Sequence, residues 1–232
     1  MIPLRDLNRS LTAPHVTRFL IVVNVIIFAV YWLSATGFLF DERLAVDMVG
    51  NGVRGKFVMY PDDVFDGQRV YTLLTSMFMH GGWYHLLGNM IYLWVFGDNV
   101  EDAFGHLSYL VFYLVCGVAA SFAQIFADQL LTGGALIGML GASGAISGVL
   151  GAYIVLYPRS KVVTWVAYFV IPIPAILFLG GWFVMQFLFG LLDTMGGVAY
   201  YAHVGGFIVG MFLGLTVGRE RKRKIRDSHM HL

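Results

Sequence analysis

Residues 141–152 read GASGAISGVLGA, and residues 202–214 read AHVGGFIVGMFLG. Small residues recur every three or four positions in both segments, so each segment, as a helix, carries a stripe of glycine or alanine along one face. Such stripes let helix backbones approach closely in lipid, where small residues mark the packed faces. The two segments therefore predict a pair of helices that pack closely against each other.

The whole chain has the composition of a membrane protein. Of its 232 residues, 58% are hydrophobic and only 12% are charged, and the mean hydropathy is +0.74. Soluble domains are about one quarter charged, so soluble, disordered and fibrous classes are excluded. The single cysteine, Cys116, excludes an intramolecular disulfide and a cysteine-built metal site. The net charge of +1 gives no drive towards nucleic acid, and we expect no cofactor, no metal and no nucleic-acid partner.

Uncharged stretches of about 20 residues can cross the hydrocarbon core of a bilayer, and the chain contains several. Glycines divide 129–158 into a re-entering loop and a helix, the prolines at 172 and 174 delay the next helix, and the acidic stretch 98–102 is expected to end the second one. The predicted fold is all-α, a six-transmembrane-helix bundle with a long first outer loop at 41–75. The six helices are expected at 19–40, 83–97, 107–127, 142–157, 174–193 and 198–217.

The distribution of Lys and Arg predicts the orientation in the membrane. With six spans, both tails and the loop at 159–161 share one side, which carries eleven basic residues against four on the other. We therefore expect a multi-pass cell-membrane protein with both termini in the cytoplasm. In this division, 1–18 is a cytoplasmic tail, 19–218 is the six-helix domain, and 219–232 is a basic cytoplasmic tail.

Polar side chains inside membrane helices are costly and usually functional. His85 and Asn89 are four residues apart and share one face of the second helix, Ser143 begins the fourth, and His203 is the only ionisable residue of the sixth. The three helices run in the same direction, so these side chains meet at one depth on the outer side. Convergence of three separate segments at one depth predicts a catalytic or binding site there.

The residue types indicate nucleophilic catalysis. A histidine within about 2.6–3.2 Å of a serine hydroxyl can take its proton and activate it, and the start of a helix presents free N–H groups suited to an oxyanion. None of the fourteen acidic residues lies in the fourth or sixth helix. The expected arrangement is a Ser–His dyad, with the glycine stripes bringing the two backbones together.

Three segments together resemble the rhomboid family of intramembrane serine proteases. They are residues 80–89 (HGGWYHLLGN), residues 141–144 (GASG) and residues 202–210 (AHVGGFIVG), in the correct order on the expected helices. The resemblance implies an endopeptidase that cleaves transmembrane segments of other membrane proteins near their outer end. It implies roles for four residues: Ser143 as nucleophile, His203 as base, and His85 and Asn89 in the oxyanion hole. We expect Gly141, Gly144, Gly206 and Gly210 to support helix packing.

The chain departs from the family pattern at two places. The family often has Trp-Arg in the first loop shortly before the second helix, where this chain has Tyr71-Thr72. An aromatic ring that packs beside the catalytic histidine in some members would fall at Ser147. These departures concern the anchoring of the loop and the packing around His203.

Other functions remain as alternatives at this stage. A haem or quinone protein would use paired histidines, but His80 and His85 lie about 140° apart around a helix; His80 is as easily structural as functional. A metalloprotease is disfavoured because H-E-x-x-H is absent, and a transporter would be expected to carry an ionisable relay in its spans. The remaining alternative is a catalytically silent rhomboid-like protein that binds other membrane proteins.

Overall fold

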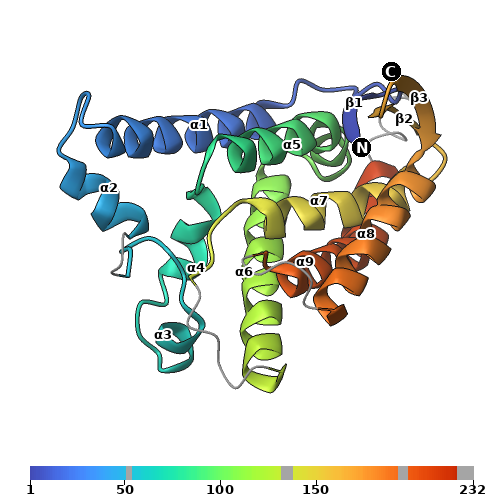
Figure 1. Ribbon diagram of the computed structural model, residues 1–232. Helices are drawn as coiled ribbons and strands as arrows, with labels where there is room; N and C mark the ends of the chain where they lie inside the picture. Colours follow the sequence, from blue (N-terminus) through green and yellow to red (C-terminus); the bar gives the residue numbers. More distant parts are fainter. Residues whose placement is uncertain (51–53, 132–137, 193–197, 224–232) are drawn as a thin grey trace.

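The computed structural model describes residues 1–50, 54–131, 138–192 and 198–223. These residues form a mostly helical bundle with a small β-sheet at one end (Figure 1). Each of the six segments predicted to be helical contains a helix, and four helices are long and apolar enough to cross a membrane. The six are α1 (His15–Ala35), α5 (Trp83–Phe104), α6 (His106–Leu131), α7 (Ser143–Leu156), α8 (Ala175–Leu192) and α9 (Tyr200–Leu213), which continues into the π-helical turn η2 (Gly214–Gly218).

α5 does not end at the acidic stretch 98–102, so that part of the prediction is wrong. The reason is that Glu101, which is completely buried, caps the start of α1. Its carboxylate accepts the N–H groups of Val16 at 2.9 Å and Thr17 at 2.8 Å, and the Thr17 hydroxyl at 2.7 Å. The first N–H groups of a helix have no partner in their own helix, and a carboxylate is favourable there. α5 continues until Gly105, whose φ of 74° suits glycine.

The predicted first loop contains short helices. They are α2 (Glu42–Val49), α3 (Pro61–Phe65), α4 (Thr72–Thr75) and the 3-10 turn η1 (Ser76–Phe78). A small separate core joins this region to α6, with Met59, Val64, Leu73 and Ile125 buried together. Residues 132–137 of the expected re-entering loop lie outside the described residues.

The expectation of an all-α fold is corrected by a three-stranded antiparallel sheet. Strand β1 (Ile2–Asp6) pairs with β2 (Lys161–Val166), which pairs with β3 (Phe169–Pro174). Uncharged runs read equally well as helix or strand by hydropathy, but the run 162–166 is rich in β-branched and aromatic residues, which favour strands. Both prolines of β3 lie on an edge strand, where a missing N–H is tolerated. The sheet brings residues 2–6 and 161–174 to one end of the bundle.

α7 and α9 touch through their backbones. A Cβ added at Gly206 would overlap the carbonyl oxygen of Gly144, and one added at Gly210 would overlap the carbonyl oxygen of Gly148. From the other side, a Cβ at Gly151 of α7 would overlap the carbonyl oxygen of Phe207. The absence of side chains at these positions is therefore what allows the two helices to lie this close.

Gly210→Ala tests this contact. The added methyl must push α9 away from α7, and overpacking of this kind costs about 1–3 kcal/mol. Gly181→Ala on α8 is the matched control because nothing lies within 4 Å of its Cβ position. Alanine favours a helix over glycine by about 1 kcal/mol, so the control should be neutral or slightly stabilised. The midpoint of thermal unfolding in detergent should be lower for Gly210→Ala than for Gly181→Ala; equal midpoints would contradict the close contact.

Asp6 attaches the sheet to the bundle. Its Oδ2 accepts the Tyr153 hydroxyl of α7 at 2.6 Å and the Asn99 amide of α5 at 2.8 Å. The pKa of the Asp6 carboxyl is raised from 3.8 to about 6, because the effect of burial, to which nearby Asp98 adds, exceeds the lowering by the Tyr153 hydrogen bond. The folded state therefore binds this proton more tightly than the unfolded state, and the contribution of Asp6 to stability falls as pH rises from about 4 to about 6.

Asp6→Asn should stabilise the protein at neutral pH. The amide oxygen can still accept both hydrogen bonds, while the cost of the partly buried charge disappears. We expect a gain on the order of 1 kcal/mol, reduced by solvent screening, which is about 2–4 °C in a domain of this size. Unfolding midpoints of variant and parent should differ most above pH 6 and converge near pH 4. A variant that is less stable at pH 7.5 would contradict this account.

Candidate active site

Ser143 and His203 form a hydrogen bond across the contact between α7 and α9. His203 Nε2 lies 2.8 Å from Ser143 Oγ. Ser143 is the first residue of α7, and His203 lies in the first turn of α9. Gly206 is one turn after His203 and contacts the carbonyl of Gly144. The close backbones therefore set the distance between the hydroxyl and the imidazole, which is suited to proton transfer.

The other ring nitrogen of His203 also has a partner. His203 Nδ1 lies 2.8 Å from Oε1 of Gln186, which is a buried residue of α8. A carboxamide oxygen can only accept, so this contact places the proton on Nδ1 and leaves Nε2 free to accept the proton of Ser143. Gln186 thus occupies the place that a carboxylate holds in a catalytic triad.

An aromatic ring packs beside His203, but from a different helix than the sequence comparison suggests. Ser147, where the family's ring would fall, donates its hydroxyl to the carbonyl of Ser143 at 2.6 Å within α7. Trp182 of α8 fills the place instead, with its ring centroid 5.9 Å from that of His203. Trp182 and Gln186 are four residues apart and share a face of α8. One helix therefore supplies both neighbours of the imidazole.

His85 and Asn89 lie beside the turn that precedes Ser143. Gly141 has a φ of 123°, which is strained for other residues, and a Cβ there would lie 2.6 Å from His85 Nε2 and 3.8 Å from Asn89 Nδ2. The buried Asn89 Nδ2 has no hydrogen-bond partner among the described residues. A buried donor without a partner is rare and calls for a function or a bound group. His80 is buried and packs edge-on against His85, with ring centroids 5.1 Å apart.

The start of α7 adds backbone donors to the same place. No side chain caps α7, since Ala142 occupies the N-cap position. The N–H groups of its first turn are therefore not used by a cap. His85 and Asn89 lie against Gly141, two residues before Ser143, so side-chain and backbone donors are close to the start of α7, an arrangement that can stabilise negative charge on an oxygen.

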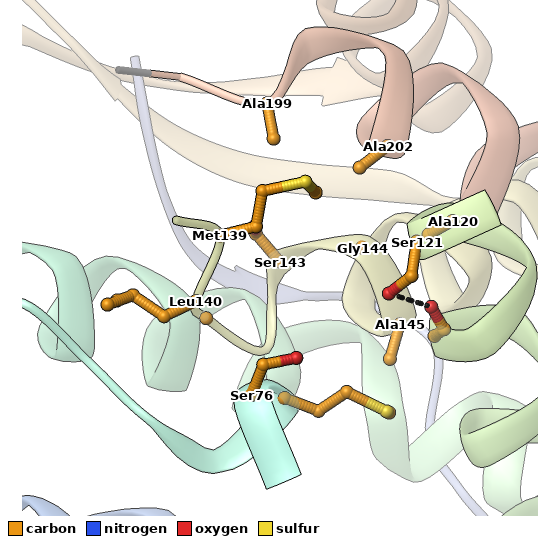
Figure 2. Close-up of a pocket in the computed structure, with 13 residues that line it drawn as sticks. Ser76, Ala120, Ser121, Met139, Leu140, Ser143, Gly144, Ala145, Ala199 and Ala202 are labelled. Carbon is orange, nitrogen blue, oxygen red and sulfur yellow. Dashed lines mark hydrogen bonds between the residues drawn. The ribbon is translucent and has the colours of Figure 1, made fainter. Parts of the chain in front are cut away.

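A small cavity opens beside Ser143 (Figure 2). Its volume is about 30 Å³, enough for about one water molecule or a methyl group. The Ser121 hydroxyl at its edge is bonded to the Gly117 carbonyl of its own helix at 3.1 Å. Its lining is mostly small or apolar and includes Met77, Gly117, Ala120, Met139, Leu140, Gly144, Ala145, Ala199 and Ala202, with Ser76 at the bottom of the view.

Gln186 and Trp182 are the site residues that sequence analysis missed. Gln186 is the only amide side chain in the otherwise apolar α8, and a polar residue inside a membrane helix is a functional signal in itself. The pairing with His203 could not be inferred, because the relative rotation of α8 and α9 is not encoded in a local pattern.

Comparison with known proteins places this site within a matched domain. The family model described as the Rhomboid domain matches residues 67–220, a range that contains every candidate residue named above. Rhomboid protein 1, mitochondrial, of Saccharomyces cerevisiae is 30% identical over 168 residues, 68% of this chain and 46% of that protein.

Two further relatives give the same picture. RHOMBOID-like protein 12, mitochondrial, of Arabidopsis thaliana is 29% identical over 176 residues, 71% of this chain and 50% of that protein. Rhomboid-like protease 5 of Toxoplasma gondii is 34% identical over 155 residues, 65% of this chain and 16% of that protein. The chain therefore spans about half the length of the first two relatives, and a smaller share of the third.

Gln186→Leu tests whether this side chain orients the imidazole. The leucine keeps the volume and removes the acceptor, so His203 can turn or adopt the other tautomer. A positioned base contributes about 10²–10⁴ in rate, and we expect the rate of Ser143 labelling by a fluorophosphonate to fall at least about tenfold. Gln186→Glu restores an acceptor and should recover much of the rate.

Thermal unfolding separates this role from a structural one. Both Gln186 variants should retain a cooperative transition, so that a loss of labelling cannot be ascribed to unfolding. If Gln186→Leu labels at the parent rate, or if Gln186→Glu is as slow as Gln186→Leu, the hydrogen bond does not position His203.

Proposed function

We propose that this chain, which belongs to the rhomboid family, is a serine endopeptidase that cleaves transmembrane segments of other membrane proteins. The hydrogen bond of 2.8 Å between Ser143 Oγ and His203 Nε2 is the observation that carries the proposal. Both residues lie within the region matched by the family model. A silent binding protein would have no need for a histidine that is hydrogen-bonded both to a serine hydroxyl and to an acceptor.

The proposed reaction follows from the positions of the donors and acceptors. His203 Nε2 takes the hydroxyl proton while Ser143 Oγ attacks the peptide carbonyl carbon, and the imidazolium then gives the proton to the leaving amine nitrogen. Gln186 accepts the Nδ1–H throughout. Water then attacks the acyl-enzyme ester with His203 again as base, which releases the carboxylate product and restores the Ser143 hydroxyl.

The negative charge that develops on the carbonyl oxygen needs donors. The buried Asn89 Nδ2 has no partner among the described residues and lies next to Gly141 together with His85. We assign these two side chains, with N–H groups at the start of α7, to the oxyanion hole. Loss of one such donor costs about 10²–10³ in rate in other enzymes.

Peptide hydrolysis also requires water at the depth of Ser143. α7 has 14 residues, a length of about 21 Å, which is shorter than the hydrocarbon core of roughly 30 Å. Ser143 at its start therefore lies below the outer membrane surface, in reach of water that enters from that side. The cavity beside it fits a small side chain of the substrate next to the scissile bond.

We place the protein in the cell membrane with six crossing helices, α1, α5, α6, α7, α8 and α9. Pairing of β1 with β2 puts the residues before α1 on the same side as the loop after α7, which supports an even number of crossings between them. The excess of Lys and Arg on that side supports a cytoplasmic location. Two relatives carry "mitochondrial" in their names, and cell fractionation distinguishes these membranes.

Ser143→Ala tests the proposed function. The change removes one hydroxyl and should abolish both fluorophosphonate labelling and cleavage of a transmembrane substrate, without a change in expression. Ser147→Ala, one turn further on α7, removes a hydroxyl that is bonded to the Ser143 carbonyl, and this control should keep both activities. Cleavage by purified Ser143→Ala at the parent rate would rule out a serine protease with this nucleophile.

A further inference from the structure

A cavity of about 500 Å³ lies at the end of the bundle opposite the predicted outer side of the site. Its walls come from the segment before α1, from the ends of α5 and α7, and from the helical residues that follow η2. Four of its lining residues are cations, Arg9, Arg219, Lys222 and Arg223, whereas Asp102 is its one acidic lining residue. The cavity is therefore strongly positive and is a separate feature from the Ser143 site.

Two of the cations are held in place by the end of α7. Arg219 Nη2 donates to the carbonyl of Val155 at 3.2 Å, and Lys222 Nζ donates to the carbonyl of Leu156 at 3.2 Å. The Lys222 ammonium also lies 3.5 Å above the ring of Tyr157. Cations are favourable at helix C-termini, where carbonyls lack partners. An arginine has five N–H donors, so the contact with Val155 holds Arg219 in place and leaves donors of its guanidinium for a ligand.

The carboxylate of Asp102 in the cavity accepts hydrogen bonds from Thr12, in the segment before α1. Asp102 Oδ1 accepts the N–H of Thr12 at 2.9 Å and the Thr12 hydroxyl at 2.7 Å. Among the described residues, Arg9 and Arg223 make no ion pair or hydrogen bond, and Arg219 makes no ion pair. With four cations and one carboxylate in its lining, the cavity carries a net charge of about +3.

The position of the cavity places it at the depth of lipid head groups. It adjoins the segment that leads into α1 and the last residues of α7, where two membrane helices reach their ends. The sheet at this end of the bundle (Figure 1) exposes aromatic side chains, with Trp165 50%, Tyr168 94% and Phe169 71% exposed. Aromatic residues exposed in this way are typical of the membrane–water interface.

We propose that this cavity binds the phosphate of an anionic phospholipid head group. Arginine matches the geometry of phosphate oxygens with paired N–H donors, and basic cavities on the cytoplasmic side of membrane proteins bind such head groups. The exposed Leu11 also lines the cavity and provides an apolar surface for the start of an acyl chain. The lipid ties the segment before α1, the end of α7 and the residues after η2 together.

Thermal unfolding of the purified full-length protein in detergent tests the proposal. Phosphatidylglycerol, phosphatidylcholine and inorganic phosphate are titrated separately at constant ionic strength. We expect phosphatidylglycerol to raise the unfolding midpoint in a saturable way, and phosphatidylcholine and inorganic phosphate to do so weakly or not at all. Native mass spectrometry should show one phosphatidylglycerol retained per chain. An equal effect of phosphatidylcholine overturns the proposal, and an equal effect of inorganic phosphate overturns its assignment to a lipid.

A charge-matched pair of double variants locates the site. Arg9→Gln with Arg223→Gln removes two cations of the cavity that make no hydrogen bond within the described chain, so the fold should persist. Arg5→Gln with Lys161→Gln removes two exposed cations from the sheet at the same end. The first variant should bind phosphatidylglycerol at least about tenfold more weakly, as expected from the loss of a charge-assisted hydrogen bond, and the second should bind like the parent. Equal weakening in both variants would mean that only the general charge of this end attracts the lipid.

Discussion

The backbone contact between α7 and α9 is the constraint on which the rest of the structure depends. Carbonyls of Gly144 and Gly148 occupy the space that side chains would take at Gly206 and Gly210. Membrane helices gain little from burying apolar surface against each other, so close packing of this kind has to supply the contact energy. The same contact fixes the separation of Ser143 and His203, and this couples helix packing directly to the geometry of the proposed dyad. α5 and α8 then add the side chains next to this pair, His85 and Asn89 from α5 and Gln186 and Trp182 from α8.

Elements of the fold that depend on local composition could be predicted from the sequence, whereas those that depend on contacts between distant segments could not. Uncharged runs located a helix in each of the six expected segments, because apolar composition is visible locally. Four of these helices are long and apolar enough to cross a membrane. The continuation of α5 through Glu101 was not predictable, because the partner of this carboxylate is the start of α1, far away in the sequence. The sheet was missed for a similar reason. Residues 162–174 are apolar enough for a membrane helix, and only pairing with β1 distinguishes a strand from it.

In the candidate site, too, some residues could be predicted from local sequence and others depend on tertiary packing. Ser143, His203, His85 and Asn89 could be proposed because each is a polar residue in an apolar helix, and helix direction places them at one depth. Gln186 and Trp182 belong to the same site through the rotation of α8 about its axis, a quantity set by tertiary packing. The aromatic neighbour of His203 illustrates this most clearly. Its usual position in the family is taken by Ser147, and the ring beside His203 comes instead from Trp182 of α8.

The pairing of β1 with β2 has a consequence for the biogenesis of the protein. Synthesis on the ribosome produces β1 first, but its partner follows only after α1, α5, α6 and α7 have been made. Contacts between such distant segments form slowly, because the entropy of closing the intervening chain is lost before the contact forms. Until then β1 exposes an unpaired strand edge, a surface prone to aggregation. Closure of the sheet is thus a late step of assembly, and it joins the first segment of the chain to the bundle only when the helices on which Asp6 rests are already in place.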